Sequence, residues 1–409
     1  MKVIKALAPA NASRVTSVLL AVLTTPVVAA TVEMTAVFRP DPAKPMQNAF
    51  VNTTPQGGYC GDHPAYCENG VFSIALPIRF KSIAPILPLH DERQGPMFKV
   101  PSYWKEVTVI HDGTGQPETV KMRINGIGAA YTIKDPLPVG IWQSTWVNAP
   151  PPCLYGGVGY GTSRYYAFFW RVPANAGVCL KQAQQLIPES LQFAYQDASF
   201  SYELVTPDPL KMSTGTYRGV LNYTVGPYKD FDTGDILLPD DDVISLNFTL
   251  TVEHTLKVDI PPGGNRVELV PQGGWQSWLQ QGRKPTRLFR DQTFTISASS
   301  RFKMSLECQY SQDGKNCAVR EPVSGHFVPL HVAVSLPHGL ADSGGQAVNR
   351  RRLLRDGSGT ELFQPGFYVD RKPGTLHFEI PADEVAEMIH PGSQRQYSGN
   401  ATVIWDSEV

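Results

Sequence analysis

The alternation of apolar and polar residues along this chain predicts many short β-strands. Residues 72–80 carry apolar side chains at every second position, and residues 244–252 alternate without interruption, which is the pattern of strands that bury one face. Other segments predict strands at residues 32–38, 106–110, 120–124, 217–225, 255–260, 266–270, 293–297, 302–310, 330–336, 376–380 and 397–405. Helical turns are predicted only at residues 180–187 and 381–389. With 35 Gly and 35 Pro to form turns, the pattern predicts an all-β fold.

The last predicted strand has no later segment to pair with it. Tyr397, Gly399, Ala401, Val403 and Trp405 fall on one parity, and polar residues fill most of the other. An immunoglobulin-like sandwich has about seven strands, and a strand in its core needs a neighbour on each side. We therefore expect the second half of the chain to form an incomplete immunoglobulin-like sandwich that lacks its last strand.

An earlier segment resembles this strand but is followed by a partner. It opens with Tyr217 and Gly219 in the same Tyr-x-Gly order, and the chain then continues through an acidic turn at residues 230–242 into residues 244–252. We interpret residues 244–252 as the strand that closes a first sandwich within the same chain. The prediction is two immunoglobulin-like β-sandwich domains in tandem, with the first at residues 31–252 and the second at residues 253–409.

The N-terminal residues predict export. Lys2, Lys5 and Arg14 precede an apolar run at residues 15–28, and the small residues Ala29 and Ala30 follow it, so we assign residues 1–30 to a signal peptide. No later run is long enough to cross a bilayer. Residues 32–38 are either the first strand of the first domain or a free N-terminal arm, and we favour the strand. The formal net charge of −1 gives no field that would recruit nucleic acid.

Six cysteines in an exported chain predict disulfides. Proximity in sequence suggests the pairs Cys60–Cys67, Cys153–Cys179 and Cys308–Cys317, and other pairings stay open. Zinc is the competing interpretation, but the chain has no Cys-x-x-Cys and no histidine pair that would complete a site. We therefore predict no metal site and no cofactor.

An aromatic-rich segment at residues 140–172 provides the candidate receptor-binding residues. We select Trp142, Trp146, Tyr160 and Arg164, because aromatic rings and guanidinium groups bind sugar faces or anchor protein partners. For any one of these aromatic residues, packing in the core is the alternative interpretation.

The chain carries no motif of a hydrolase. It has neither His-Glu-x-x-His nor Gly-x-Ser-x-Gly, and carboxylates such as Asp240 and Asp242 lie in one turn rather than opposed across a cleft. Calcium at this turn is conceivable, although we prefer a solvated linker. We predict no enzyme activity. The alternative is a self-contained secreted carbohydrate-binding protein or glycoside hydrolase.

Together these features resemble the tip adhesin subunits of bacterial chaperone-usher pili. The resemblance depends on the signal peptide, the two β domains, the terminal strand opening with Tyr397-x-Gly399, and the run Trp275-Gln-Ser-Trp-Leu-Gln-Gln-Gly-Arg-Lys-Pro through Phe302 to Cys308. It covers the second domain well and the first only loosely.

The resemblance implies a fimbrial adhesin assembled by strand addition and exposed at the tip of the fimbrium. The second domain would be an incomplete pilin-type sandwich lacking its last strand. A periplasmic pilus chaperone would first complete it, and the arm of the adjacent pilin subunit would replace the chaperone at the outer-membrane usher. The terminal residues named above would line the contact, with the carboxylate of Val409 held by the chaperone. The first domain would bind a host or surface receptor, with glycans as one class.

Overall fold

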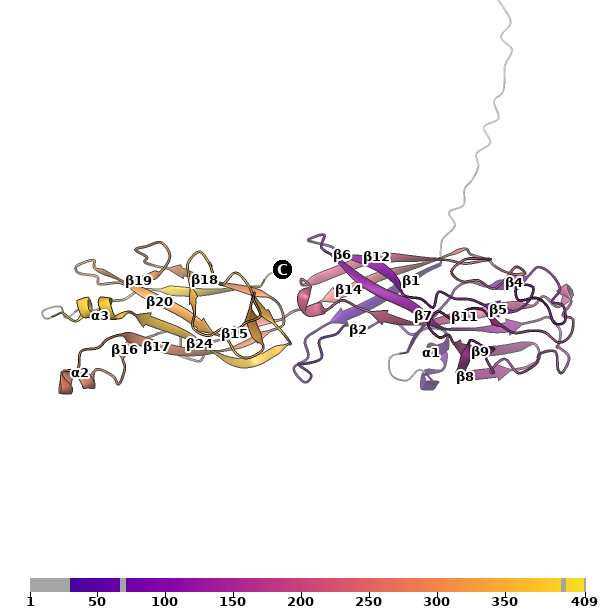
Figure 1. Ribbon diagram of the computed structural model, residues 1–409, viewed down its shortest axis with the longest axis horizontal. Coiled ribbons are helices and arrows are strands. Elements are labelled where there is room, and N and C mark those ends of the chain that lie inside the picture. Colours follow the sequence, from indigo (N-terminus) through magenta and orange to yellow (C-terminus); the bar gives the residue numbers. More distant parts are fainter. Residues whose placement is uncertain (1–29, 67–70, 391–394, 408–409) are drawn as a thin grey trace, which may run out of the picture.

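The computed structural model describes residues 30–66, 71–390 and 395–407, and its regular secondary structure is almost entirely β-strand (Figure 1). The predicted all-β class is confirmed. The helices are short: α1 (Tyr59–Asp62), α2 (Gln276–Gln281) and α3 (Ala382–Met388), with 3-10 turns at Pro64–Tyr66, Glu189–Leu191 and Pro209–Lys211. None of the helices in this part of the chain has the length and apolar character needed to cross a membrane.

The strands fall into two groups, which Figure 1 shows end to end along the long axis. The first strand group comprises β1 (Ala30–Phe38), β2 (Val51–Asn52), β3 (Phe72–Ala75), β4 (Phe80–Ser82), β5 (Met97–Phe98), β6 (Lys105–His111), β7 (Pro117–Thr132), β8 (Leu154–Gly161), β9 (Tyr165–Arg171), β10 (Cys179–Leu180), β11 (Ala194–Val205), β12 (Gly215–Thr224), β13 (Leu237–Pro239) and β14 (Val243–Val252). Its main sheet runs β13-β4-β11-β7-β6-β12-β14-β1-β2, while β5 and β10 form a small separate sheet.

The second strand group forms two sheets. Its strands are β15 (Leu256–Asp259), β16 (Val270–Pro271), β17 (Leu288–Ala298), β18 (Phe302–Cys308), β19 (Cys317–Arg320), β20 (Phe327–Ser335), β21 (Leu340–Asp342), β22 (Arg351–Leu353), β23 (Phe363–Pro365), β24 (Val369–Ile380) and β25 (Ala401–Ser407). One sheet has the order β15-β17-β24-β20-β19, and the other has the order β21-β23-β18-β25.

Residues 30–38 form an internal strand and not a free arm. β1 pairs in parallel with β14 along its whole length, from Ala30 opposite Ile244 to Phe38 opposite Val252. The side chains of Met34 and Phe38 lie in the core, as the alternating pattern requires of a strand with one buried face. The preferred interpretation of this segment is confirmed.

β14 closes the first strand group within the chain, as predicted. It pairs antiparallel with β12 on one side and parallel with β1 on the other. The Tyr217 hydroxyl donates to the Ser213 carbonyl oxygen at 3.2 Å and accepts from the Ser213 N–H at 2.9 Å. This loop-to-strand bond resembles the tyrosine corner of immunoglobulin-like sandwiches, and it fixes the start of β12.

Two local predictions are wrong. Residues 180–187 do not form a helix, because Ala183 pairs with Trp142 and Ile187 pairs with Ile86 in isolated bridges that keep the segment extended. Residues 266–270 do not form a strand, because the chain turns there, with the Arg266 N–H donating to the Gly263 carbonyl oxygen at 3.2 Å, and only Val270 enters β16. In the acidic turn, Asp240 and Asp242 are exposed, as a solvated turn requires, whereas Asp232 is 2% exposed and accepts from the Arg93 guanidinium at 2.8 Å. The structure has no group of three or more potential metal ligands within its described ranges.

Two of the three predicted disulfides are present. Cys153 is bonded to Cys179 and Cys308 is bonded to Cys317. Cys60 is also disulfide-bonded, but its predicted partner Cys67 lies outside the described residues, so that pair stays a prediction.

The two strand groups differ in how fully they bury their apolar residues. In the described chain, the core of the first group has 49 buried residues and 10 partly buried ones packed against it, whereas the second has 20 and 15. We therefore expect residues 30–252, made alone, to unfold in one cooperative transition by calorimetry. A broad transition without a heat-capacity step would contradict this division of the chain.

Candidate functional site

The last described strand has one open flank. β25 pairs antiparallel with β18, from Ala401 opposite Cys308 to Ser407 opposite Phe302. No other described strand pairs with β25. Its unpaired N–H and C=O groups therefore form an edge to which another chain can add a strand.

The apolar side chains of this edge are only partly covered. Val403 and Trp405 lie opposite the buried Leu306 and Met304, and directly opposed residues share a face of the sheet. Both side chains pack against the core, but neither is fully buried. In β12, which carries the matching Tyr-x-Gly sequence and has strands on both sides, the inward-facing Tyr217, Leu221 and Tyr223 are at most 5% exposed. The open flank therefore leaves apolar surface next to it.

The first strand of the second group is also an edge. Among the strands that the structure describes, β15 pairs only with β17 and stands at the end of its sheet. Its apolar residues Leu256 and Val258 are partly buried, as is Leu269 just before β16. Apolar residues on both the first and the last strand of this group are thus only partly covered. In the first strand group, β14 lies between the first strand, β1, and β12, which carries the matching Tyr-x-Gly sequence.

In the structure, the terminal strand begins later in the sequence than predicted. Residues 397–405 were expected to be continuous, but β25 begins at Ala401 because the chain first pairs elsewhere. Ser398 exchanges backbone hydrogen bonds of 2.9 and 3.0 Å with Arg320 of β19, and the Tyr397 hydroxyl lies 2.9 Å from His326 Nδ1. The segment therefore crosses from one sheet to the other. Val409 lies outside the described residues.

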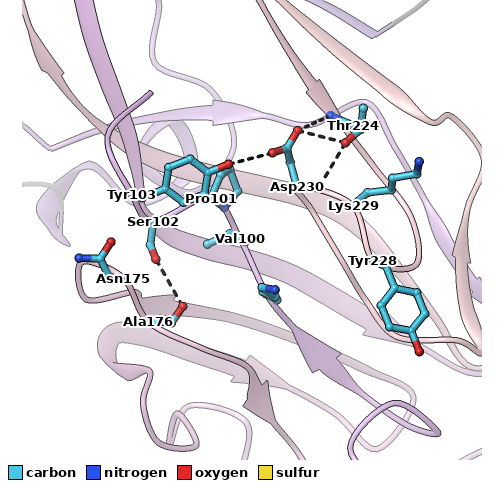
Figure 2. Close-up of a pocket in the computed structure, with 11 residues that line it drawn as sticks. Val100, Pro101, Ser102, Tyr103, Asn175, Ala176, Thr224, Tyr228, Lys229 and Asp230 are labelled. Carbon is cyan, nitrogen blue, oxygen red and sulfur yellow. Dashed lines mark hydrogen bonds between the residues drawn. The ribbon is translucent and has the colours of Figure 1, made fainter. Parts of the chain in front are cut away.

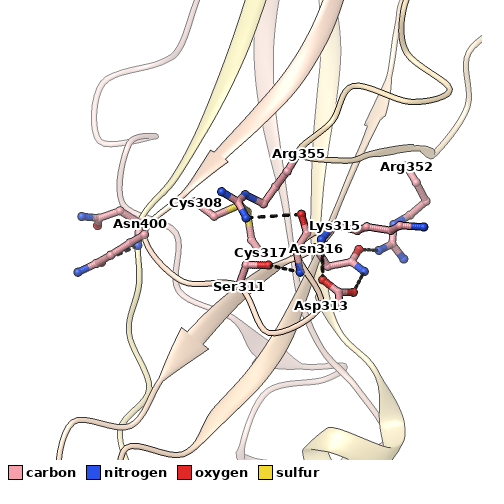
Figure 3. Close-up of a disulfide and its surroundings, with 11 residues drawn as sticks. Cys308, Ser311, Asp313, Lys315, Asn316, Cys317, Arg352, Arg355 and Asn400 are labelled. Carbon is pink, nitrogen blue, oxygen red and sulfur yellow. Dashed lines mark hydrogen bonds between the residues drawn. A yellow bond between two sulfur atoms is a disulfide. The ribbon is translucent and has the colours of Figure 1, made fainter.

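A disulfide joins the two sheets at this crossing (Figure 3). Cys308 ends β18 and Cys317 begins β19, and Ala401 pairs with Cys308. The Asn400 carbonyl oxygen accepts from the Gln309 N–H at 2.8 Å. Covalent and backbone bonds thus fix the end of the edge where β25 begins.

Glycine is favoured in the two Tyr-x-Gly sequences for the same physical reason. A Cβ at Gly219 would lie 2.4 Å from the Thr108 carbonyl oxygen, and one at Gly399 would lie 3.1 Å from the Ala318 carbonyl oxygen. The first contact is closer than real Cβ atoms approach backbone, and the second would require the neighbouring backbone to move by a few tenths of an ångström. Glycine at both positions thus permits a close approach to the neighbouring backbone.

We expect Gly399→Val to destabilise the second strand group by about 1–3 kcal/mol, because its branched side chain must push the strand away from Ala318. Thermal unfolding of the chain with a complementing strand measures this loss. Gly366→Val is the matched control, since a Cβ there meets nothing within 4 Å. Equal losses for the two variants would show that the close approach at Gly399 is unimportant.

Two of the predicted receptor residues lie in the core. Trp146 is 1% exposed, and its carbonyl oxygen accepts from the Trp170 Nε1–H at 2.7 Å. Trp142 packs against the same core, with its ring edge-on to Trp146. This packing favours the alternative interpretation of these aromatics as core residues, with Trp146 fully buried and Trp142 partly buried beside it.

The other two predicted receptor residues lie on the surface. Tyr160 on β8 is 49% exposed and its ring meets that of His63 edge-on, and Arg164 is exposed in the connection between β8 and β9. They belong to a hairpin at one side of the main sheet, since within the described ranges β8 pairs only with β9. Receptor binding there stays a prediction.

Sequence reasoning missed a serine–histidine–aspartate chain on the second strand group. Ser335 Oγ lies 2.8 Å from His377 Nε2, and His377 Nδ1 lies 2.7 Å from Asp291 Oδ1. The order is that of a serine hydrolase triad. However, the Arg350 N–H donates to Ser335 Oγ itself at 3.0 Å, whereas hydrolysis needs N–H donors directed at the substrate's oxyanion. We interpret this group as a polar network across three neighbouring strands.

Comparisons with known proteins give matches only among solved structures. No family model and no curated protein matches the chain. A chaperone–tip adhesin complex of CFA/I fimbriae is 10% identical, with 93% of this chain and 97% of that chain covered and a TM-score of 0.23. A mutant of the CfaE adhesin of enterotoxigenic E. coli is 12% identical, with 93% of both chains covered and a TM-score of 0.25.

The third match is the CsuC–CsuE chaperone–tip subunit complex of Acinetobacter baumannii, at 9% identity, with 92% of this chain and 98% of that chain covered and a TM-score of 0.22. All three are fimbrial adhesins or complexes that contain one, which is the class that the sequence resembles. Because these TM-scores lie below 0.5, the function proposed below depends on the strand arrangement of the chain itself.

Proposed function

We propose that this chain is a fimbrial adhesin subunit whose second strand group is completed by a strand from another polypeptide. The single observation that supports this proposal most directly is the open flank of β25 with its partly covered Val403 and Trp405. In the first strand group, β14 occupies the corresponding place, antiparallel to β12 and parallel to β1. A donor strand antiparallel to β25 would copy this arrangement.

The expected energetic gain is large compared with the stability of a domain. Full burial of an apolar side chain contributes about 1.5–3 kcal/mol, and a donor strand would cover several half-buried ones. Proteins are stable by only about 5–15 kcal/mol in total. Completion of the sheet is therefore enough to decide whether the second strand group stays folded.

The proposed partners follow from this strand addition. They are a periplasmic pilus chaperone, the outer-membrane usher and the arm of an adjacent pilin subunit, and the chaperones named in two of the solved structures are the first kind of partner. Residues 30–38 cannot serve as a donor arm while they pair with β14, which favours a place at the fibre tip. The first strand group would then carry the receptor contact.

Capture by a chaperone tests the proposal. Co-expressed in the periplasm, the mature chain should purify in a 1:1 complex with a pilus chaperone, and Val403→Asp should abolish that capture by placing a charge on the strand-addition face. Val220→Asp is the matched control, because Val220 is 58% exposed on β12. A chain that is monodisperse and equally stable without any partner would instead favour a self-contained secreted carbohydrate-binding protein.

A further inference from the structure

A polar pocket on the first strand group has the size of a ligand site. Its volume is about 520 Å³, and its walls come from residues 99–103, 175–176, 224 and 228–230, as Figure 2 shows. Small-molecule sites in proteins span roughly 300–1,000 Å³. The pocket is separate from the hairpin that carries Tyr160 and Arg164.

The pocket is built on a fixed turn. Lys99 and Asp232 exchange two backbone hydrogen bonds, each of 2.9 Å. The Asp232 carboxylate accepts from the Arg93 guanidinium and from the Tyr228 N–H, at 2.8 and 2.9 Å. Lys99 and residues 228–230 are therefore held in place relative to one another before any ligand arrives, which lowers the entropy cost of binding.

Tyr228 adopts an unusual backbone conformation at this turn. Its φ is +62°, a region in which residues other than glycine are strained and which is enriched at binding sites. The ring is 76% exposed, and the Arg93 guanidinium lies 3.6 Å from the ring centroid on one side. The buried pairing of Arg93 thus holds a tyrosine ring in solvent.

The charges of the pocket favour an anionic ligand. Asp230 is already satisfied, because it accepts from the Tyr103 hydroxyl at 3.2 Å and from the Thr224 N–H at 2.9 Å, and it pairs with Lys105 at 3.6 Å. In contrast, Lys99 and Lys229 are exposed, and the described residues give neither of them an ion-pair partner. Two ammonium groups are left to interact with a ligand.

We propose that this pocket binds an acidic saccharide. Its carboxylate or sulfate group pairs with Lys99 and Lys229, and one sugar ring stacks on an exposed aromatic face, that of Tyr228 or of the 48% exposed Tyr103. Aromatic rings bind the apolar faces of sugars, and lysine pairs with anionic groups as a point charge. This inference rests on the proposed function as an adhesin and names the class of its ligand.

Calorimetric titration of the full mature chain, purified with its chaperone or a fused donor strand, tests the proposal. Sialyllactose and hyaluronan oligosaccharides provide carboxylates, a heparin tetrasaccharide provides sulfates, and maltotetraose is the neutral probe. We expect one acidic class to bind with an affinity that falls as salt rises, and maltotetraose not to bind. Lys99→Gln with Lys229→Gln should weaken binding about tenfold.

Two further variants locate the contact. Tyr228→Ala should weaken binding several-fold through lost stacking, whereas Lys134→Gln, an exposed lysine outside the pocket, should leave binding unchanged. Three results would overturn the proposal: no acidic probe binds, maltotetraose binds equally well, or binding is lost in Tyr160→Ala and kept in the double lysine variant. Because chaperone capture is measured separately with Val403→Asp, failure here leaves the assembly proposal untouched.

Discussion

A donor strand fused after Val409 through a flexible linker is expected to raise both the soluble yield and the thermal stability of the second strand group. The strand should be about ten residues long with apolar residues at every second position, so that one face enters the core beside Val403 and Trp405. Trp405 already packs against Phe294 and Phe302, with ring centroids 5.0 and 5.8 Å away. The donor would therefore extend an existing aromatic cluster.

The expected increase in transition temperature follows from apolar burial. Several side chains at about 1.5–3 kcal/mol each should raise the transition temperature by roughly 10 °C or more, since 1 kcal/mol shifts a domain of this size by about 2–4 °C. Scanning calorimetry of the fused and unfused chains measures this shift. The first strand group should unfold at the same temperature in both, because its β14 is already in place.

The control is a donor of equal length with every apolar residue replaced by serine. It keeps the linker and the backbone hydrogen bonds but cannot fill the core, so it should recover little of the gain. Equal yields and transitions for the unfused chain, the apolar donor and the serine donor would mean that the flank of β25 needs no partner. The strand-addition account would then be wrong.

The alternating pattern predicts strands well wherever one face of the strand is buried. β14 and β18 match their predicted segments to within two residues at each end, because period-2 alternation is a direct consequence of a sheet with one apolar face. Residues 180–187 failed because their apolar positions, Ala183 and Ile187, also fit a helical spacing. Only the contacts with Trp142 and Ile86 decide in favour of an extended chain, and these are long-range.

The functional surfaces are harder to read from the sequence than the fold. Aromatic residues predict both cores and binding sites, and only burial separates Trp146 from Tyr160. The pocket beside Tyr228 is formed by segments more than 120 residues apart in sequence, and its conformation depends on the buried pairing of Arg93 with Asp232. No local sequence motif predicts such a site. The open flank of β25 could be predicted because it depends on strand order alone.

Trp146→Ala is expected to cause the largest loss of stability of any single aromatic substitution discussed for this chain. The ring is buried and packs against the rings of Tyr131, Trp142, Phe168, Trp170, Phe193 and Tyr195. Truncation of a buried tryptophan costs about 3–5 kcal/mol, because the cavity does not fully collapse. Denaturant unfolding of residues 30–252 measures this loss. In the chain with a fused donor strand, the unfolding transition of the first strand group measures it as well.

Trp146→Phe separates packing from hydrogen bonding. Among the described residues, the Nε1–H of Trp146 has no hydrogen-bond partner, and an unpaired buried donor is unfavourable. Phenylalanine removes that donor along with part of the ring, so the loss should be only about 1 kcal/mol. Tyr160→Ala, on the exposed hairpin, should change the unfolding free energy by less than about 0.5 kcal/mol. If Trp146→Ala were as mild as Tyr160→Ala, Trp146 would not be a core residue, and its assignment as a receptor contact would return.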